Sequence, residues 1–244
     1  MQSESAPEKE ELSPQVLQLN HLAKRGATMA EVAQLDDDGN IQTPAAAILA
    51  LKLGNARFYS GDTSGQVLSA IERRSQIVSQ HPFAIVLGCS DSRVPVEVIY
   101  DQRAGDIFVI RVAGNVVDTS TLGSIEYAVK HLNSKVVILM GHEGCGAVKA
   151  AMLDRESHPA ELENLNLLID LIVPSVEKLP QIRDQKARMR EAAIANVRQQ
   201  VHKLKQNPVV IAAVQNKQIQ VIGAYYELSS GAVDFFETEE ELLP

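Results

Sequence analysis

The stretch FAIVLGCSDSR, residues Phe83 to Arg93, decides how this chain folds. Its first half is an apolar run of strand length that ends at Gly88. Three reactive or charged side chains, Cys89, Asp91 and Arg93, follow within the next five positions. A short, continuous apolar run that ends in a glycine is typical of a strand buried on both faces. The stretch therefore predicts a buried strand with a thiol, a carboxyl group and a guanidinium at its carboxyl end.

A second stretch, KVVILMGHEGC from Lys135 to Cys145, repeats this order. It places His142 and Cys145 directly after its own apolar run. A third apolar run, Ile107 to Val112, and an amphipathic helix predicted over Leu122–Leu132 lie between the two. Near-continuous apolar strands that alternate with crossovers indicate a parallel sheet covered by helices on both faces. We therefore expect an α/β fold with a mostly parallel central sheet flanked by helices.

The rest of the chain divides into a tail, an arm and a core. Residues 1–12 are polar and acidic and are expected to be a disordered tail. Residues 13–80 are expected to form an N-terminal helical arm, with helix starts at Ser13-Pro14 and Thr43-Pro44. Residues 81–244 are expected to form the α/β core, as a single domain with the arm. The further elements that we expect are helices over 44–61, 65–80, 146–153, 161–173 and 184–206, the last ended by Asn207-Pro208, and a C-terminal antiparallel hairpin of 218–226 and 233–237.

Composition argues against several classes of function. Hydrophobic residues make up 45% of the 244 residues, enough for a sizeable core. The formal net charge of -8 argues against a surface for nucleic acid or anionic membranes. No apolar run approaches the roughly 20 residues of a membrane span, and the first residues show no signal-peptide pattern. We therefore expect a soluble, cytoplasmic protein, or a periplasmic one if the sequence is a processed form, without a nucleic-acid partner.

Four side chains with metal-binding atoms follow the first and third predicted strands. The carboxyl ends of parallel strands lie at one edge of a sheet, so Cys89 and Asp91 can meet His142 and Cys145 if the two strands are neighbours. Two thiolates with an imidazole suit zinc better than calcium or magnesium, and zinc also takes carboxylates. The two cysteines are the only ones in the chain and could form a disulfide, but the neighbouring Asp91 and His142 favour a metal. We interpret the four residues as one zinc site.

The role of Asp91 separates two classes of zinc protein. If its carboxylate always ligates the metal, the site is closed and structural; if it can leave, the fourth position is open for water. Arg93 offers an alternative partner, because a guanidinium can hold a carboxylate with two charge-assisted hydrogen bonds. An ordinary surface ion pair in a loop would use the same two residues.

Other chemistries fail on spacing. A phosphatase-type loop needs an arginine six positions after its cysteine, where this chain has Pro95. Gly141, Gly144 and Gly146 do not form the GxGxxG pattern of a dinucleotide loop. We expect these glycines to let the backbone turn tightly around the metal.

Four motifs, in this order, resemble the β class of carbonic anhydrases. They are GCSDSRVP from Gly88, RVAGN from Arg111, GSIEYAV from Gly123 and GHEGCGAV from Gly141. The likeness is dense from Asn55 to Cys145 and continues to GAYYEL near the C-terminus. The resemblance implies a lyase that reversibly hydrates CO2 to bicarbonate and a proton through a zinc-bound hydroxide. It also implies a homodimer or tetramer, in which the N-terminal arm embraces a second subunit.

The resemblance assigns roles to the residues of the predicted zinc site. Cys89, His142 and Cys145 match the three constant zinc ligands of the family. Asp91 matches an aspartate that either caps the zinc or releases it to pair with Arg93, so that the two residues form a gating dyad.

The resemblance also implies residues that bind substrate or transfer protons. Gln80 matches a glutamine that hydrogen-bonds bicarbonate. Phe108 and Tyr127 match aromatic residues of a narrow CO2 pocket, often at a subunit boundary, although on their own they would be taken as core residues. Gly146, next to the last zinc ligand, is counted with the substrate-binding residues. His131, one helical turn after Tyr127, matches a histidine that passes protons to solvent in some relatives, although a lone histidine there is also typical of a partly exposed position.

The chain departs from the family at two positions. One subgroup closes its site with bicarbonate bound in a second pocket that includes a tryptophan three residues before the first zinc cysteine. That position is Val86 here, and the chain has no Trp, so we expect a site that opens readily. Glu143 stands where relatives carry a small or hydroxyl residue. Its carboxylate either changes the electrostatic field at the entrance of the pocket or is simply a solvated side chain.

Two other functions stay open at this point. One is hydrolysis of carbonyl sulfide or carbon disulfide at the same site. The other is a non-catalytic, zinc-stabilised protein in which Asp91 is permanently coordinated.

Overall fold

The computed structural model describes residues 41–65, 68–157, 162–237 and 240–242. Of these, 41–65 and 81–242 belong to one compact unit and 68–80 to a second. The second unit contains α4 (Ala70–Ser75), shorter than the helix predicted over 65–80. It begins in a capping box, in which Ser69 Oγ accepts a hydrogen bond from Glu72 N and Glu72 Oε2 accepts one from Ser69 N. The predicted acidic tail and the helix start at Ser13-Pro14 lie outside the described residues.

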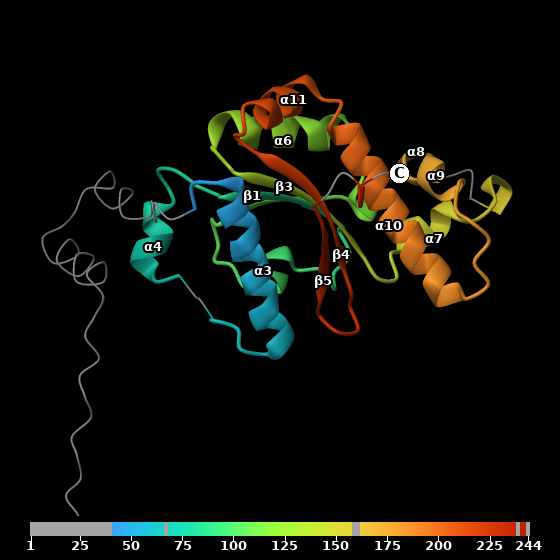
Figure 1. Cartoon of the computed structure of the whole chain (residues 1–244), viewed down its shortest axis with the longest axis horizontal. Coiled ribbons are helices and arrows are strands. Elements are labelled where there is room, and N and C mark those ends of the chain that lie inside the picture. The colour runs from blue at the N-terminus through green and yellow to red at the C-terminus, as the bar shows by residue number, and fades with distance from the viewer. Residues whose placement is uncertain (1–40, 66–67, 158–161, 238–239, 243–244) are drawn as a thin grey trace, which may run out of the picture. The chain divides into compact units, whose positions relative to one another are not determined.

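A five-stranded sheet of order β2-β1-β3-β4-β5 forms the centre of the larger unit (Figure 1). Its strands are β1 (Ala84–Gly88), β2 (Ile107–Arg111), β3 (Val136–His142), β4 (Gln220–Tyr226) and β5 (Val233–Phe236). The pairs β1–β2, β1–β3 and β3–β4 are parallel, and β4–β5 is antiparallel. The predicted mostly parallel sheet and the C-terminal hairpin are therefore confirmed. β1 and β3 are neighbours, as the predicted zinc site requires.

Helices cover both faces of this sheet (Figure 1). One face carries α3 (Pro44–Ser60) and α5 (Val96–Ile99), and the other carries α6 (Thr119–His131), α10 (Gln185–Leu204) and α11 (Pro208–Gln215). Three further helices, α7 (Gly146–Ala151), α8 (Glu163–Asp170) and α9 (Val173–Val176), pack together and against α10. Short 3-10 turns lie at Ala113–Asn115 and Arg155–Ser157. None of the described helices is long and apolar enough to cross a membrane.

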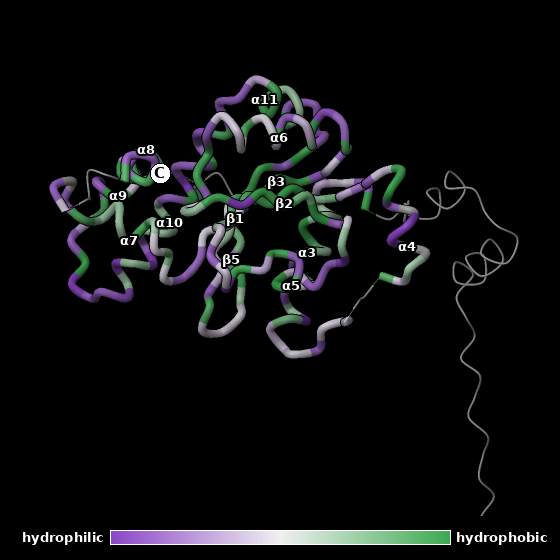
Figure 2. The backbone as a smooth tube through the Cα atoms, turned by 180° about the vertical axis from the view of Figure 1, so that it is seen from behind, coloured by the Kyte–Doolittle hydropathy of each residue, from purple (hydrophilic) through white to green (hydrophobic). Residues whose placement is uncertain are grey.

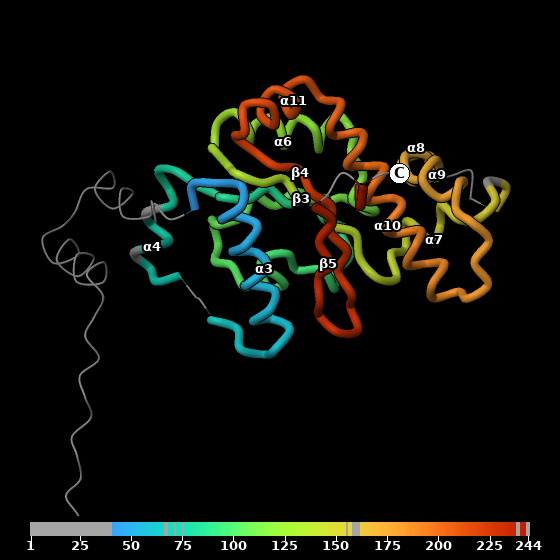
Figure 3. The backbone as a smooth tube through the Cα atoms, in the orientation of Figure 1, coloured from blue at the N-terminus to red at the C-terminus, as the bar shows by residue number. Residues whose placement is uncertain are grey.

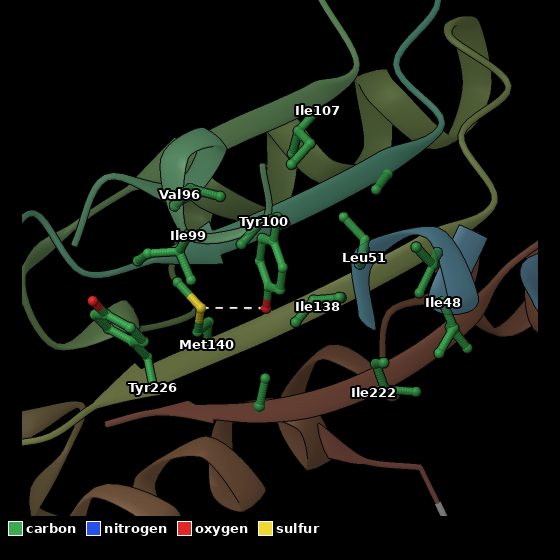
Figure 4. Packing of buried hydrophobic residues seen from close by; sticks show 14 of the residues in the cluster. Ile48, Leu51, Val96, Ile99, Tyr100, Ile107, Ile138, Met140, Ile222 and Tyr226 are labelled. Carbon is green, nitrogen blue, oxygen red and sulfur yellow. Dashed lines mark hydrogen bonds between the residues drawn. The ribbon is translucent and has the colours of Figure 1, made fainter. Parts of the chain in front are cut away.

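Alternate side chains of β1 point to opposite layers of the core. Ile85 and Leu87 pack with α6, α10 and α11, whereas Ala84 and Val86 pack with α3 and α5. Figure 4 shows the second of these layers, in which the Tyr100 hydroxyl donates to Met140 Sδ at 3.3 Å. Because both faces of the central strands are covered, β1 is apolar throughout and β3 is apolar up to its last residue, His142, and Figure 2 shows both as hydrophobic stretches of the backbone.

Helix α3 confirms the helix predicted after Thr43-Pro44. Thr43 Oγ1 accepts a backbone hydrogen bond from the first turn at 3.2 Å. Asn55, buried within the helix, donates to the carbonyl oxygens of Ile99 at 3.1 Å and Gly231 at 2.9 Å. It also accepts a hydrogen bond from Val233 N at 2.9 Å. These bonds tie α3 to the C-terminal hairpin, which lies beside it although the two are far apart in the sequence (Figure 3).

The end predicted for the helix over 184–206 is confirmed, because α10 ends at Leu204, before Asn207-Pro208. The helix that follows was not predicted: α11 begins at Pro208 and Asn207 caps it, accepting from Val209 N at 2.9 Å and Val210 N at 3.2 Å. Proline fits the first turn of a helix because the N–H that it lacks would have no partner there. The helix predicted over 161–173 is shorter in the structure, because α8 ends at Asp170. A separate helix, α9, begins at Val173 with Pro174 in its first turn, where the N–H that proline lacks would have no partner.

Candidate metal centre

Three potential metal ligands meet at the carboxyl ends of β1 and β3. Cys89 directly follows β1, His142 is the last residue of β3, and Cys145 precedes α7. Their sulfur and ring nitrogen atoms all lie within 4.8 Å of one another, and the three residues are at most 4% exposed. Both cysteines are free thiols, so the disulfide alternative is not realised. We call Cys89, His142 and Cys145 the ligand trio.

The imidazole of His142 has one ring nitrogen satisfied and one without a partner. Nδ1 lies 2.9 Å from the carbonyl oxygen of Glu143, so it is placed to donate its proton there. Nε2 is fully buried and has no hydrogen-bond partner among the described residues. A histidine that ligates a metal through one nitrogen normally donates from the other to a carbonyl or carboxylate. The orphaned Nε2 beside two thiols therefore fits a metal ligand.

The pKa values of the two thiols of the ligand trio are shifted in opposite directions. The amide N–H groups of Asp91 and Gly114 both donate to Cys89 Sγ at 3.4 Å. Hydrogen bonding with Cys145 lowers the pKa of Cys89 to about 4, against the opposing effect of burial. The same interaction and burial raise the pKa of Cys145 far above its ordinary value. The lowered pKa of Cys89 favours its thiolate, which is the form of cysteine that binds a cation such as zinc.

The predicted pair of Asp91 and Arg93 is present in the structure. Asp91 Oδ1 accepts from both N and Nε of Arg93 at 2.9 Å, and Oδ2 accepts from Nη2 at 2.8 Å. These bonds from Arg93 hold the pKa of the Asp91 carboxyl group well below its usual range. Asp91 Oδ2 is 4.0 Å from His142 Nε2. The carboxylate therefore borders the ligand trio while its hydrogen bonds are directed to Arg93.

Arg111, which the site prediction missed, braces the loop between Cys89 and Asp91. It is the last residue of β2, and it donates from Nε to the carbonyl oxygen of Cys89 at 3.0 Å and from Nη2 to that of Asp91 at 2.6 Å. A basic residue at the carboxyl end of a strand next to the ligand-bearing strand was the available signal. Arg111 opens the RVAGN motif, which contributed only to the resemblance.

Glu143 fastens the ligand loop to the C-terminal hairpin. Its backbone N–H donates to the Tyr226 carbonyl oxygen at 2.8 Å, and its carboxylate accepts from Ser229 N at 3.0 Å. Lys186 Nζ lies 3.4 Å from the other carboxylate oxygen. The Ser229 amide, with Lys186, lowers the pKa of Glu143. With 22% of its side chain exposed, Glu143 is not a simply solvated residue.

Three residues predicted to bind substrate or transfer protons form an aromatic row away from the trio. The ring centroids of Phe108 and Tyr127 are 6.2 Å apart, and those of Tyr127 and His131 are 5.2 Å apart. Phe108 pairs in register with Ile85, four residues before Cys89, which is about 13 Å along the strand direction. Tyr127 is 48% exposed. A role for these rings at the trio would therefore need a second copy of the chain.

Two more predicted site residues stay predictions. Gln80 belongs to the second compact unit. Gly146 is the exposed first residue of α7, directly after Cys145, and a Cβ built there would meet no atom within 4 Å.

Comparison with known proteins agrees with this geometry. A family model described as carbonic anhydrase matches residues 84–233. The carbonic anhydrase of Mycolicibacterium smegmatis is 38% identical over 198 residues, 78% of this chain and 92% of the relative. Carbonic anhydrase 2 of Mycobacterium tuberculosis is 36% identical over 189 residues, 77% of this chain and 90% of the relative. A solved structure of a tetrameric β-carbonic anhydrase from Sordaria macrospora matches with a TM-score of 0.59 and 32% identity, over 65% of this chain and 82% of that one. The chain therefore belongs to the carbonic anhydrase family, in its β class.

Proposed function

We propose that this carbonic anhydrase hydrates CO2 reversibly with a zinc ion held by Cys89, His142 and Cys145. The observation that carries the proposal is the buried Nε2 of His142, which has no hydrogen-bond partner in the described part of the chain and lies with two thiols within 4.8 Å. Two sulfur ligands and one nitrogen ligand match the preferences of zinc, and three protein ligands leave one position open, as in catalytic zinc sites. When bound, zinc supplies Lewis-acid chemistry, which in three-histidine carbonic anhydrases lowers the pKa of bound water to about 7.

Asp91 orients the attacking water in this proposal. Three hydrogen bonds from Arg93 fix the carboxylate as an acceptor, with Oδ2 4.0 Å from His142 Nε2. An oxygen held between Asp91 and the ligand trio would donate its proton to Oδ2 and direct a lone pair towards CO2. If the pair with Arg93 breaks, the carboxylate can turn to the open position and close the site. Asp91 and Arg93 thus act as a gate, closed at lower pH and open at alkaline pH.

Stopped-flow CO2 hydration from about pH 6.5 to 9, with zinc measured on the same sample, tests the proposal. We expect turnover that rises towards alkaline pH, with about one zinc per chain. Asp91→Asn keeps the shape of the side chain but removes the carboxylate. It should lower kcat/KM by about 10²-fold, in the range of positioned acid–base groups, with zinc content unchanged.

Two results would overturn parts of this account. Full zinc occupancy without turnover would favour the closed, structural site, and an assay with carbonyl sulfide would then test the sulfur-substrate alternative. An Asp91→Asn variant with the wild-type rate and pH profile would refute the gate while leaving the zinc site intact.

We also propose that the chain works as a homo-oligomer, as a dimer or tetramer. The exposed apolar side chains Leu49, Leu53 and Tyr59 of α3 offer a surface for a second copy. The aromatic row of Phe108, Tyr127 and His131 could then serve the trio of a neighbouring copy, and the related structure from Sordaria macrospora is described as tetrameric. Light scattering coupled to size exclusion tests this, and a monomer with full activity would refute it.

A further inference from the structure

Two amide side chains lie completely buried on one face of α10, behind the ligand trio. Asn196 and Gln200 are both 0% exposed and stand one helical turn apart. Gln200 Nε2 donates to Asn196 Oδ1 at 3.0 Å, so the two form a connected pair. Buried amides are tolerated only where their hydrogen bonds are made. The partners of this pair therefore show what it holds.

The pair holds the backbone of the loop that follows β2. Asn196 Nδ2 donates to the Gly114 carbonyl oxygen at 2.8 Å, and Gln200 Oε1 accepts from Val117 N at 2.8 Å. Gln200 Nε2 also donates to the Leu171 carbonyl oxygen at 3.1 Å. One helix thus fixes both ends of the segment 114–117.

The segment 114–117 begins with a backbone conformation that is unfavourable unless neighbouring groups hold it. Gly114 has a φ of 71° and Asn115 a φ of 46°, two left-handed residues in succession. A non-glycine residue in this region is uncommon and persists where its surroundings hold it. A Cβ at Gly114 would lie 2.5 Å from Ile172 Cδ1, so the loop also has no room to shift towards α9.

Gly114 connects the loop to the ligand trio. Its N–H donates to Cys89 Sγ at 3.4 Å, while its carbonyl oxygen accepts from Asn196. The Gly114 N–H that donates to the Cys89 sulfur is therefore positioned by the hydrogen bond between the Gly114 carbonyl oxygen and Asn196 of α10. Hydrogen bonds to a ligating atom orient it and withdraw charge from it, and their loss typically lowers metal affinity by about 10–100-fold.

We propose that Asn196 and Gln200 are positioning residues that hold the Gly114 amide against the Cys89 sulfur and so set the affinity and electronic character of the metal site. The inference rests on the proposed metal site but assigns a task to residues outside it. The hydrogen bonds of the pair go to Gly114, Val117 and Leu171, so it acts on the metal site through the loop of residues 113–117.

The test compares Asn196→Leu with a matched change on the same helix. Leucine has the same branched arrangement of heavy atoms as asparagine but has neither donor nor acceptor. The control is Val201→Ala, at a buried position that packs with Ile85 and Leu87 against the sheet. Gln200→Met serves as the second variant, since it keeps the length of the side chain and loses the bond to Val117.

Three measurements on these variants separate positioning from general destabilisation. In the metal-free protein, hydrogen–deuterium exchange of the segment 113–117 should become at least about tenfold faster in Asn196→Leu than in Val201→Ala. Zinc affinity by competition with a chromophoric chelator should fall by about 10–100-fold in Asn196→Leu and stay near wild type in Val201→Ala. With cobalt in place of zinc, the sulfur-to-metal charge-transfer band should move to longer wavelength, because a sulfur without its N–H donor is richer in charge.

Each outcome counts for or against the inference. Equal exchange, equal affinity and an unmoved cobalt band in Asn196→Leu and Val201→Ala would overturn it. If Asn196→Leu does not fold, the same three readouts on Gln200→Met decide. A wild-type protein that binds no zinc would refute the proposed metal site instead, and the exchange comparison on the metal-free chain would still test whether the pair holds the loop.

Discussion

Replacing Gly141 with alanine tests how closely α10 must approach the sheet beside His142. A Cβ at Gly141 would lie 2.7 Å from Val197 Cγ2 and 3.4 Å from the Ala193 carbonyl oxygen. Carbon atoms in contact prefer a separation of about 3.5–4.0 Å, so either the valine or the helix must move. Gly223 on the neighbouring strand faces the same valine, because its Cβ would lie 2.8 Å from Val197 Cγ1. The side chain of Val197 thus packs directly against the backbone of both glycines.

Two opposing effects determine how much Gly141→Ala changes the free energy of unfolding. Alanine reduces the freedom of the unfolded chain and stabilises by about 0.4–1 kcal/mol where the native backbone accepts it, and Gly141 has no positive φ. Overpacking a core typically costs about 1–3 kcal/mol. We therefore expect Gly141→Ala to lower the free energy of unfolding by about 1–2 kcal/mol. Because His142 is the next residue of β3, zinc affinity should fall as well.

Urea unfolding of the metal-free protein measures this loss. Val197→Ala, combined with Gly141→Ala, tests whether a smaller side chain at position 197 removes the overlap. Alone, Val197→Ala removes two buried carbons and should cost about 1.5–3 kcal/mol. In the double variant, the methyl added at position 141 occupies the space that the valine leaves. The combined loss should then be smaller than the sum of the single losses by at least about 1 kcal/mol. Losses that add to within about 0.5 kcal/mol would refute the reasoning that Val197 is the obstacle.

Three further predictions concern charge and metal. Burial would raise the pKa of Asp101, but hydrogen bonds from Arg57 and Ser64 outweigh it and lower the pKa. The ionised carboxylate of Asp101 therefore stabilises the folded protein fully at any pH above its pKa in the unfolded chain, about 3.9. This stabilisation is lost as the pH falls through the lower pKa that Asp101 has in the folded protein. Urea midpoints should show Asp101→Asn less stable than wild type at neutral pH and the gap closing below about pH 4, whereas a constant gap would contradict the pairing. Glu143→Gln keeps an acceptor for Ser229 N, so its free energy of unfolding should lie within about 0.5 kcal/mol of wild type. Glu143→Ala removes the acceptor and should lower the free energy of unfolding by about 1 kcal/mol. Equal losses in the two variants would show that the bond to Ser229 contributes nothing. Removing zinc with a chelator should lower Tm, and zinc at about 1,000 times its Kd should restore about 4 kcal/mol; an unchanged Tm would mean that the folded trio binds no metal.

The ligand trio could be predicted from the sequence because of how parallel sheets are built. Cys89 follows one apolar run, while His142 and Cys145 follow another, and parallel strands end at the same edge. The prediction needed only that the two strands be neighbours. The pair of Asp91 and Arg93 was equally accessible, since its members are two residues apart and of opposite charge.

Asn196 and Gln200 could not be predicted in the same way. Helical spacing places Asn196 and Gln200 beside the apolar residues Ala193, Val197 and Leu204, but it does not say which groups two buried amides would bind. Their burial depends on the loop at Gly114 to Val117, about 80 positions earlier, and on the carbonyl group of Leu171. Only the packed tertiary structure brings these partners together. Propensity and periodicity describe one element at a time, so a polar contact between distant elements escapes them.

The contrast between the ligand trio and the dyad explains where the site can move. The trio is buried and is held by backbone groups: the amides of Asp91 and Gly114 at Cys89, and the carbonyl group of Glu143 at His142. Moving any of its members would break buried hydrogen bonds, each loss costing about 1–3 kcal/mol. The Arg93 side chain is 57% exposed, so water can replace its contact with Asp91, and exposed ion pairs contribute only about 0–1 kcal/mol. Turning the Asp91 carboxylate away from Arg93 would therefore cost less than moving any member of the ligand trio, which is the physical reason to place the proposed gate in Asp91 and Arg93 and not in the ligands.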